Sequence, residues 1–441
     1  MMTTQHTAYS RLHPQQHPSP LSEPLHLPAS RHTTLTMSNP APVKQKAIFE
    51  SLTEYGESAL DNGWLPDAVL RPVIRKLNRV RLAEIDKGTG AANHAAKMDF
   101  IAKLGEPNRP LAEHQAKANE QHYEVPTSFL KLCLGPRMKY SSCYYPSLED
   151  STRPGGAKDI KYAKESLAEA EEVMLKSYCE KAGLGEQGPG QGEGLSILDL
   201  GCGWGSLGLY LAEKYPKASI KMLSNSRTQK VHIDGTCKEK GFGNVEVITG
   251  DFTQFDFEEK EQFTHVLSIE MFEHMKGYPH LFAKVATWLK PRGKVFIHVF
   301  VHKDTPYEFE DNDGWMSKHF FSGGTMPSLD LFTYFQKDLV LQKSWFIPGN
   351  HYAQTLESWL RLQDSNKTEG MRLLEEDAEQ KGFGKDEGRK SFYRFRVFFL
   401  ACAEFFAMDR GETWGLGHYL YVISRRLSDI GWLTAHIVFV F

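Results

Sequence analysis

The sequence has few of the features that mark secreted, zinc-binding or membrane-spanning proteins. Its six cysteines form no C-x-x-C pair, which argues against a disulfide framework and structural zinc, so we predict no metal site. No apolar stretch approaches the roughly 20 residues that span a bilayer. The net charge of -3 gives no general attraction to nucleic acid or to an anionic membrane. These absences predict a soluble, cytoplasmic protein with no nucleic-acid partner and no transmembrane segment.

The composition allows one large core with additions at both ends. The chain has 441 residues, 41% of them hydrophobic, and no long linker divides its middle. Residues 1–43 are rich in His, Pro, Ser and Thr, so we expect a disordered extension there. A transit peptide is one alternative for this segment, and translation that starts at Met37 is another. Residues 425–441 end in a bare apolar run that is either a docking segment or a gene-model artefact.

Between these ends, the patterning predicts a helical region followed by an α/β domain. Helical spacing of apolar residues and a later cluster of polar aromatics assign residues 44–150 to a helical region and a lid over a ligand. In residues 159–424 strands alternate with helices, which predicts a parallel sheet. The expected strands are residues 196–200, 219–224, 245–249, 263–269, 294–299, 339–346 and 417–423, with helices at 355–381 and 391–407 and an aromatic insert at 303–337.

The most informative stretch runs from Ser196 to Ser206, where an apolar strand meets a glycine-rich turn. Glycines at 201, 203 and 205 remove each Cβ where the backbone turns and a ligand approaches. The turn lacks the Gly-Lys-Ser/Thr ending of a P-loop, which argues against a triphosphate. Together with Asp199, the D-x-G-x-G-x-G order is that of S-adenosylmethionine (SAM) methyltransferases.

Two further strand ends carry polar residues that suit a cofactor. Ligands of open α/β sheets bind beyond the carboxyl ends of the strands. Asn225 and Gln229 follow the second predicted strand and suit a ribose, whereas Asp251 and Phe252 follow the third and suit an adenine ring. Each group alone is better explained by a turn or a helix cap. Together, one per strand, they favour a SAM site.

The fourth predicted strand ends in Glu270-Met271-Phe272-Glu273-His274. If a helix starts near Glu270, then Glu270, Glu273 and His274 share one face at i, i+3 and i+4. The alternative is that the glutamates favour a helix N-terminus and the histidine is a packed neighbour. An aliphatic amine has a pKa of about 10.4 and must lose a proton before it can accept a methyl group. Two carboxylates beside an imidazole suit that task.

These motifs, with Lys139-Tyr140-Ser141 and Gln121 to Pro126, resemble the cyclopropane fatty acid synthase and mycolic acid cyclopropane synthase group, in its coclaurine N-methyltransferase-like branch. The similarity runs from about residue 48 to 422. It implies a Rossmann-like, seven-stranded α/β methyltransferase fold. In such a fold Tyr140 and Ser141 would contact the amino-acid end of SAM, Gly201 and Gly203 would lie beneath it, and Asn225, Gln229 and Asp251 would surround the adenosine.

The resemblance also offers two roles for the remaining residues. In the N-methyltransferase branch, the residues matching Glu270, Glu273 and His274 bind the amine and remove its proton. In the cyclopropane synthases, a bicarbonate ion is the base, and the residues matching Glu273, Ser142, His298 and Tyr352 hold it.

Departures from the family pattern favour the first role. Ser142 replaces the cysteine of the bicarbonate site, and Glu270 replaces a glycine typical of the cyclopropane synthases, whereas His298 and Tyr352 keep the bicarbonate-like pattern. We therefore predict SAM-dependent N-methylation of a small amine. Methylene transfer to unsaturated lipid acyl chains is the alternative, and a SAM-binding module without catalysis is a third possibility. The acceptor, the number of methyl groups and the oligomeric state, a homodimer included, stay open.

Overall fold

The computed structural model describes residues 56–112, 125–149, 163–185, 192–309, 315–320 and 323–424. All of them belong to one compact unit, Thr53–Phe441. The predictions made for residues 1–43, for residues 425–441 and for Gln121 to Glu124 lie outside the described residues. The domain boundaries proposed from the sequence stay predictions.

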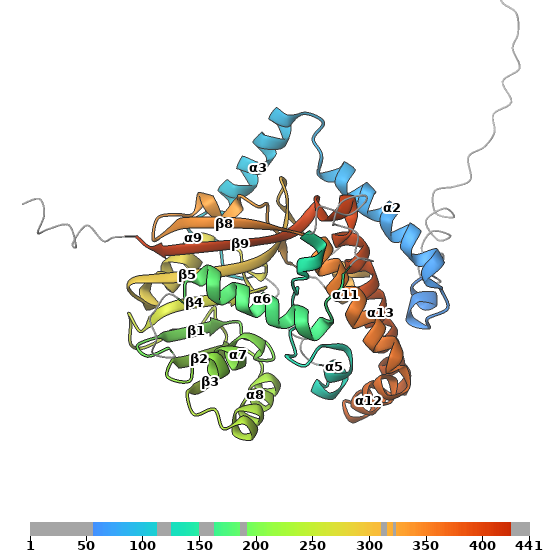
Figure 1. Ribbon diagram of the computed structural model, residues 1–441. Coiled ribbons are helices and arrows are strands. Elements are labelled where there is room, and N and C mark those ends of the chain that lie inside the picture. The colour runs from blue at the N-terminus through green and yellow to red at the C-terminus, as the bar shows by residue number, and fades with distance from the viewer. Residues whose placement is uncertain are drawn as a thin grey trace, which may run out of the picture. The chain divides into compact units, whose positions relative to one another are not determined.

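A seven-stranded sheet with the order β3-β2-β1-β4-β5-β9-β8 forms the centre of this unit (Figure 1). Its strands are β1 (Ser196–Leu200), β2 (Ser219–Ser224), β3 (Val245–Thr249), β4 (Phe263–Ile269), β5 (Leu289–His302), β8 (Leu339–Pro348) and β9 (Trp414–Ile423). The strands from β3 to β5 pair in parallel, and β9 pairs antiparallel with both β5 and β8. The α/β fold and the first four strands are as predicted, and β5 is longer at both ends than residues 294–299.

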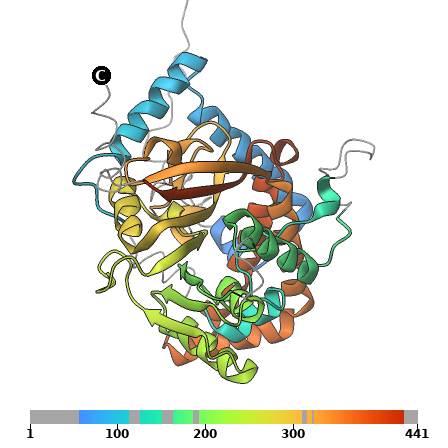
Figure 2. The same cartoon turned by 60° about the vertical axis from the view of Figure 1, so that its left-hand side comes forward.

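Helices cover both faces of the sheet. Successive side chains of a strand point to opposite faces, so each strand contributes apolar side chains to the core on either side. On β5, Phe296 and Phe300 join the core beneath α6 (Leu167–Ala182), α7 (Ser206–Lys214) and α8 (Arg227–Lys240). Ile297 and Val299 join the second core, with α9 (Tyr278–Trp288). Figure 2 shows β8 and β9 at one edge of the sheet and β3 at the other. His298 lies between Phe296 and Phe300 at alternate positions of β5, so its side chain faces the same side of the sheet as α6.

A helical layer is inserted between β8 and β9. The predicted helix over residues 355–381 is two helices, α11 (Asn350–Ser365) and α12 (Lys367–Gln380), because Asn366 between them has ψ 20° and leaves the helical conformation. α13 (Lys385–Phe406) begins after Gly384, where φ is +79°. α5 (Thr127–Cys133) packs against α11 and α12.

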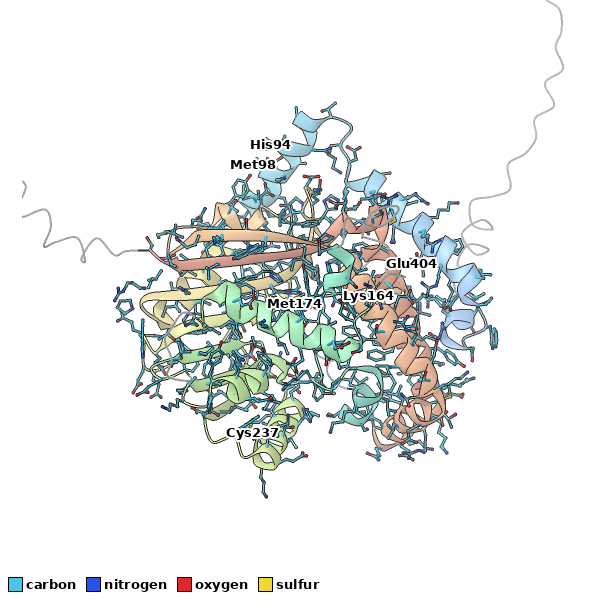
Figure 3. All side chains as sticks on the ribbon, viewed as in Figure 1. His94, Met98, Lys164, Met174, Cys237 and Glu404 are labelled. Atoms are coloured by element: carbon cyan, nitrogen blue, oxygen red, sulfur yellow. The ribbon has the colours of Figure 1, made fainter. Side chains whose placement is uncertain are left out.

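The expected helical N-terminal region is present in α2 (Asp67–Ile85) and α3 (Gly90–Leu104). α2 lies along α13 (Figure 1). Glu404, labelled in Figure 3, belongs to α13. Its carboxylate accepts hydrogen bonds from Arg71 and Arg75 of α2. None of the helices within the described residues combines the length and apolarity of a membrane span.

The aromatic insert at 303–337 contains β6 (Tyr307–Glu308), α10 (Trp315–His319), β7 (Thr325–Met326) and a short 3-10 helix, η4 (Leu331–Tyr334). Four of its aromatic side chains, Tyr307, Phe320, Phe332 and Phe335, are buried, as expected for ordinary core residues.

Candidate active site

The glycine loop after β1 encloses a cavity. Gly201, Gly203 and Gly205 have φ of +81°, +51° and +83°, which favour glycine. A Cβ added at Gly201 would lie 2.9 Å from Met271, and one at Gly205 would lie 2.8 Å from Ile233, whereas one at Gly203 would meet no atom within 4 Å. Packing therefore explains the first and third glycines, and the open space beside Gly203 leaves room for a ligand.

The lid and the sheet meet around this cavity. The structure brings together Tyr140, Ser141, Asp199, Gly201, Gly203 and Glu270 among its lining residues. The carboxylate of Asp199 accepts a 2.9 Å hydrogen bond from the backbone N–H of Gly208, and burial raises its pKa to about 7. Asp199 thus holds the first turn of α7 as well as lining the cavity.

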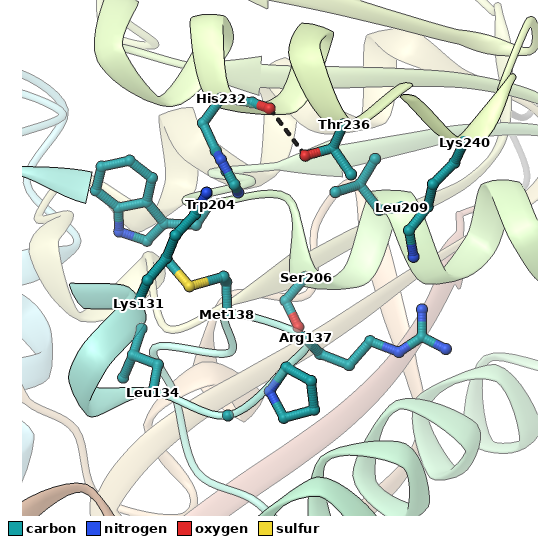
Figure 4. Close-up of a pocket in the computed structure, with 12 residues that line it drawn as sticks. Lys131, Leu134, Arg137, Met138, Trp204, Ser206, Leu209, His232, Thr236 and Lys240 are labelled. Atoms are coloured by element: carbon teal, nitrogen blue, oxygen red, sulfur yellow. Dashed lines mark hydrogen bonds between the residues drawn. The ribbon is translucent and has the colours of Figure 1, made fainter. Parts of the chain in front are cut away.

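A second cavity, of about 360 Å³, adjoins the first at the glycine loop (Figure 4). The two share Met138, Trp204 and Ser206. The basic side chains of Lys131, Arg137 and Lys240 line it. Arg137 also forms ion pairs with Glu172 and Glu213.

The polar residues at the ends of β2 and β3 form a helix cap and a turn, the two structural alternatives to a cofactor-binding role. Ser226 caps α8 by accepting from the backbone N–H of Gln229, and the side-chain Oε1 of Gln229 accepts from the Ser224 hydroxyl at 2.5 Å. Within the described part of the chain, the buried side-chain N–H₂ of Gln229 has no hydrogen-bond partner. Asn225 is exposed.

At the end of β3, Asp251 accepts two 2.8 Å hydrogen bonds from Thr253. The Phe252 ring is buried against Trp288 with the Lys284 ammonium 4.8 Å from its centroid. Asn225, Gln229, Asp251 and Phe252 are not lining residues of the cavity beside Gly203. The structure therefore brings the lid and β1 residues together but leaves these four outside that cavity.

No α-helix starts near Glu270, so the condition for a shared helix face is not met. Glu270 has φ of +50°, Phe272–His274 form one 3-10 turn, and α9 begins only at Tyr278. After the 3-10 turn, the backbone N–H groups of Lys276 and Gly277 donate to the carbonyls of Leu111 and Pro110, so the segment leaves the helical path there. Glu270, Glu273 and His274 are close because of this tight turn, not because of a helix face.

Three donors from three separate segments hold the Glu270 carboxylate. Its Oε1 accepts from the Ser142 backbone N–H at 3.0 Å and lies 3.1 Å from His298 Nε2, and its Oε2 accepts from the Tyr352 hydroxyl at 2.8 Å. Burial alone would raise the pKa of Glu270, but the hydrogen bond from His298, the ammonium of Lys139 and the Ser142 N–H lower it below its usual value. Glu270 is thus a buried carboxyl group held in its ionised form.

Glu273 has the opposite character. It is buried, and neither of its carboxyl oxygens has a hydrogen-bond partner among the described residues. Burial and the nearby charge of Glu270 raise its pKa well above the usual value. Burial lowers the pKa of His274 to about 4, against the charge of Glu270. Two neighbouring carboxyl groups with opposite pKa shifts are the pattern of a site that handles protons.

Residues 111–407 match the mycolic acid cyclopropane synthetase family. The chain belongs to this family. Among its relatives it is 32% identical to (S)-coclaurine N-methyltransferase of Thalictrum flavum subsp. glaucum, over 86% of this chain and 96% of that protein. It is 28% identical to the cyclopropane-fatty-acyl-phospholipid synthase of Escherichia coli (strain K12), over 54% of each chain.

Solved structures of family members have the same fold. A coclaurine N-methyltransferase bound to N-methylheliamine and SAH superimposes with a TM-score of 0.73 at 30% identity, and the match covers 85% of this chain and 99% of that one. The cyclopropane synthase MmaA2 from Mycobacterium tuberculosis has a TM-score of 0.55 at 20% identity, over 71% and 99% of the two chains. The protein is a SAM-dependent methyltransferase with the family's seven-stranded sheet.

The cavity beside the glycine loop has the character that SAM requires. It offers space at Gly203 and the N-terminus of α7 without a side-chain cap. Within the described residues, the Ser206 hydroxyl and the Trp204 indole N–H, which belong to lining residues, have no hydrogen-bond partner. Unpaired donors at a helix N-terminus suit a carboxylate such as the one SAM carries.

Sequence reasoning missed the residues that surround His298. Its Nδ1 lies 3.0 Å from the Tyr178 hydroxyl and 2.8 Å from His418 Nε2. The pairing register of β5 and β9 places His418 directly opposite His298. Lys139 donates to the Ser141 hydroxyl and to the Ser142 carbonyl. The sequence pointed to it only as the first residue of the Lys139-Tyr140-Ser141 motif. A cross-strand register between distant segments leaves no local signal in a sequence.

Proposed function

We propose that this enzyme transfers the methyl group of SAM to the nitrogen of a small cationic amine, with Glu270 binding the ammonium form and Glu273 with His274 receiving its proton. The observation that carries the proposal is the buried Glu270 carboxylate, held in its ionised form beside the cavity by three donors. Tyr140, Ser141, Gly201 and Gly203 would hold the amino-acid end of SAM. Asn225, Gln229 and Asp251 would hold its adenosine, and the Phe252 ring would pack against the adenine.

SAM supplies an electrophilic methyl group and leaves as a neutral thioether. The protein's task is to bring an unprotonated nitrogen into line with that methyl group. An amine with a pKa of about 10.4 arrives as a cation, which the ionised Glu270 attracts. The bound cation favours loss of the Glu273 proton to solvent. The carboxylate that results, whose pKa burial still raises, can then accept the ammonium proton. His274 provides a neutral imidazole beside both carboxyl groups.

The same geometry argues against lipid cyclopropanation. Ser142, His298 and Tyr352 occupy the positions that the family resemblance assigns to the bicarbonate base. Here their donors point at the chain's own Glu270 carboxylate, so that an added anion would be repelled and would lack donors. The relatives named as coclaurine and pavine N-methyltransferases support an amine acceptor.

The test is to incubate the purified protein with methyl-labelled SAM, a panel of aromatic and aliphatic amines, and vesicles of unsaturated phospholipid. Label is expected in the amine extract, and label confined to the acyl chains would overturn the proposal. The variant Glu270→Gln keeps the shape of the side chain but removes its charge. We expect the KM for the amine to rise about tenfold or more, because the ammonium loses its ion-pair partner. Turnover that stays unchanged from about pH 6 to 9 would exclude this role of Glu270. The affinity for SAH, measured by calorimetry, is the internal control and should not change.

A further inference from the structure

Behind His298, buried hydrogen bonds continue to a lysine on another element. His298 Nδ1 lies 2.8 Å from Nε2 of His418 on β9, and Nδ1 of His418 lies 2.8 Å from Nζ of Lys181 on α6. On its other side, His298 Nε2 lies 3.1 Å from Glu270. Both imidazoles are fully buried. Three consecutive hydrogen bonds therefore link Lys181 to Glu270 through two histidines.

The two ends of this row have opposite hydrogen-bonding character. An ammonium group only donates, and a carboxylate only accepts. A neutral imidazole has one N–H and one acceptor nitrogen, so each histidine transmits the direction that it receives. Lys181 donates to His418 Nδ1, which places the His418 proton on Nε2. His418 then donates to His298 Nδ1, which places the His298 proton on Nε2 and directs it at Glu270. This arrangement of protons alone satisfies all three bonds.

Both histidines are neutral in this environment. Burial lowers the pKa of His298 to about 4. Burial, with the ammonium groups of Lys181 and Lys139, lowers the pKa of His418 well below its usual value. The Tyr178 hydroxyl near His298 Nδ1 can donate or accept, so it does not set the direction.

We propose that Lys181 and His418 are positioning residues that fix the proton of His298 on Nε2 and thereby keep Glu270 ionised. The inference rests on the proposed function only in its last step, the use of Glu270 by the acceptor amine. The tautomer of His298 itself does not depend on which acceptor is methylated.

The charge of Lys181 makes the arrangement dependent on pH. The Lys181 ammonium contacts His418 on β9 and lies 5.4 Å from the centroid of the Trp345 ring on β8. It also interacts electrostatically with Glu180 on α6 and with His351 on α11. Lys139 acts on the two linking histidines from the lid side. Burial lowers the pKa of Lys181 to about 8, against the charge of Glu180. Below that pH the ammonium fixes the direction. Above it the amine gains a lone pair and can accept, so the direction is lost and activity should fall on the alkaline side.

The test compares Lys181→Met with Lys181→Arg, since arginine keeps a donor that does not lose its proton. At pH 7 we expect kcat/KM to fall about tenfold in Lys181→Met, as for the loss of one hydrogen bond to a charged group. Lys181→Arg should retain activity and lose the alkaline fall near pH 8. Lys176→Met, which removes a 70% exposed lysine from the same helix, is the matched control and should behave as the wild type.

Imidazole ¹⁵N NMR of the protein without substrate supplies an independent readout. The His298 signal, assigned by its loss in His298→Gln, should show a protonated Nε2 in the wild type and in Lys181→Arg, and a mixture of tautomers in Lys181→Met. A wild-type His298 protonated on Nδ1, or a Lys181→Met variant with the wild-type tautomer and pH profile, would overturn the inference. If Lys181→Met fails to fold, the wild-type tautomer and the alkaline limb of Lys181→Arg still decide. A wild type that labels only acyl chains refutes the amine proposal and leaves the NMR test intact.

Discussion

Glu270 shows how a single residue can combine strain with function. Its φ of +50° is unfavourable for a side chain with a Cβ, at a cost of about 1 kcal/mol. Its own N–H donates to the His298 carbonyl, while its carboxylate accepts from Ser142, His298 and Tyr352. These hydrogen bonds offset the strain and hold the carboxylate at the cavity that Glu270 lines.

Gly203 gives a residue-scale test of the cofactor cavity. Gly203 and Gly241 both have positive φ, +51° and +71°, and a Cβ on either would meet nothing within 4 Å. Gly203→Ala and Gly241→Ala should therefore each cost about 1 kcal/mol of stability through backbone strain. Only Gly203 lines the cavity, so only Gly203→Ala should weaken SAH binding, by about tenfold or more as a methyl group enters the ligand's space. Calorimetry and urea unfolding measure the two effects, and equal SAH affinities in both variants would place the ligand elsewhere.

At the scale of elements, an ion-pair cluster fastens the N-terminal helices to the inserted ones. Glu404 on α13 is only 5% exposed, and its carboxylate receives Arg71 and Arg75 from α2. Arg71 also reaches Glu357 on α11. One of the helices that this cluster joins, α11, also carries Tyr352, which donates a hydrogen bond to Glu270.

Glu404→Ala should lower the free energy of unfolding by about 2 kcal/mol, because it removes a buried acceptor that two guanidinium groups share. Glu369→Ala is the control, since it removes a carboxylate from a pair whose partners are each 50% exposed, and it should change stability by less than about 0.5 kcal/mol. Urea denaturation of both variants measures the difference. Equal losses would mean that burial of the Glu404 cluster contributes nothing.

At the scale of the whole molecule, the described residues build two large cores on the two faces of one sheet. The expectation that residues 1–43 add no folded part stays a prediction from their composition. A chain that begins at Met37 should keep the melting temperature and the methyl-transfer rate of the full chain. A loss of more than about half of the turnover would instead assign this segment a part in the site.

The sequence by itself determined the parallel strands and the glycine loop, because period-2 burial and positive φ leave local signals in residue type. It also identified Glu270, Glu273, His298, Tyr352 and Ser142 as candidates, through the family motifs. Only the tertiary structure decided how they meet. The helix considered at Glu270 does not form, and the backbone N–H groups of Lys276 and Gly277 donate to residues 111 and 110 instead. The link from Lys181 through His418 to His298 depends on the register of β5 and β9, which joins residues 120 apart in the chain and is set by packing rather than by any local pattern.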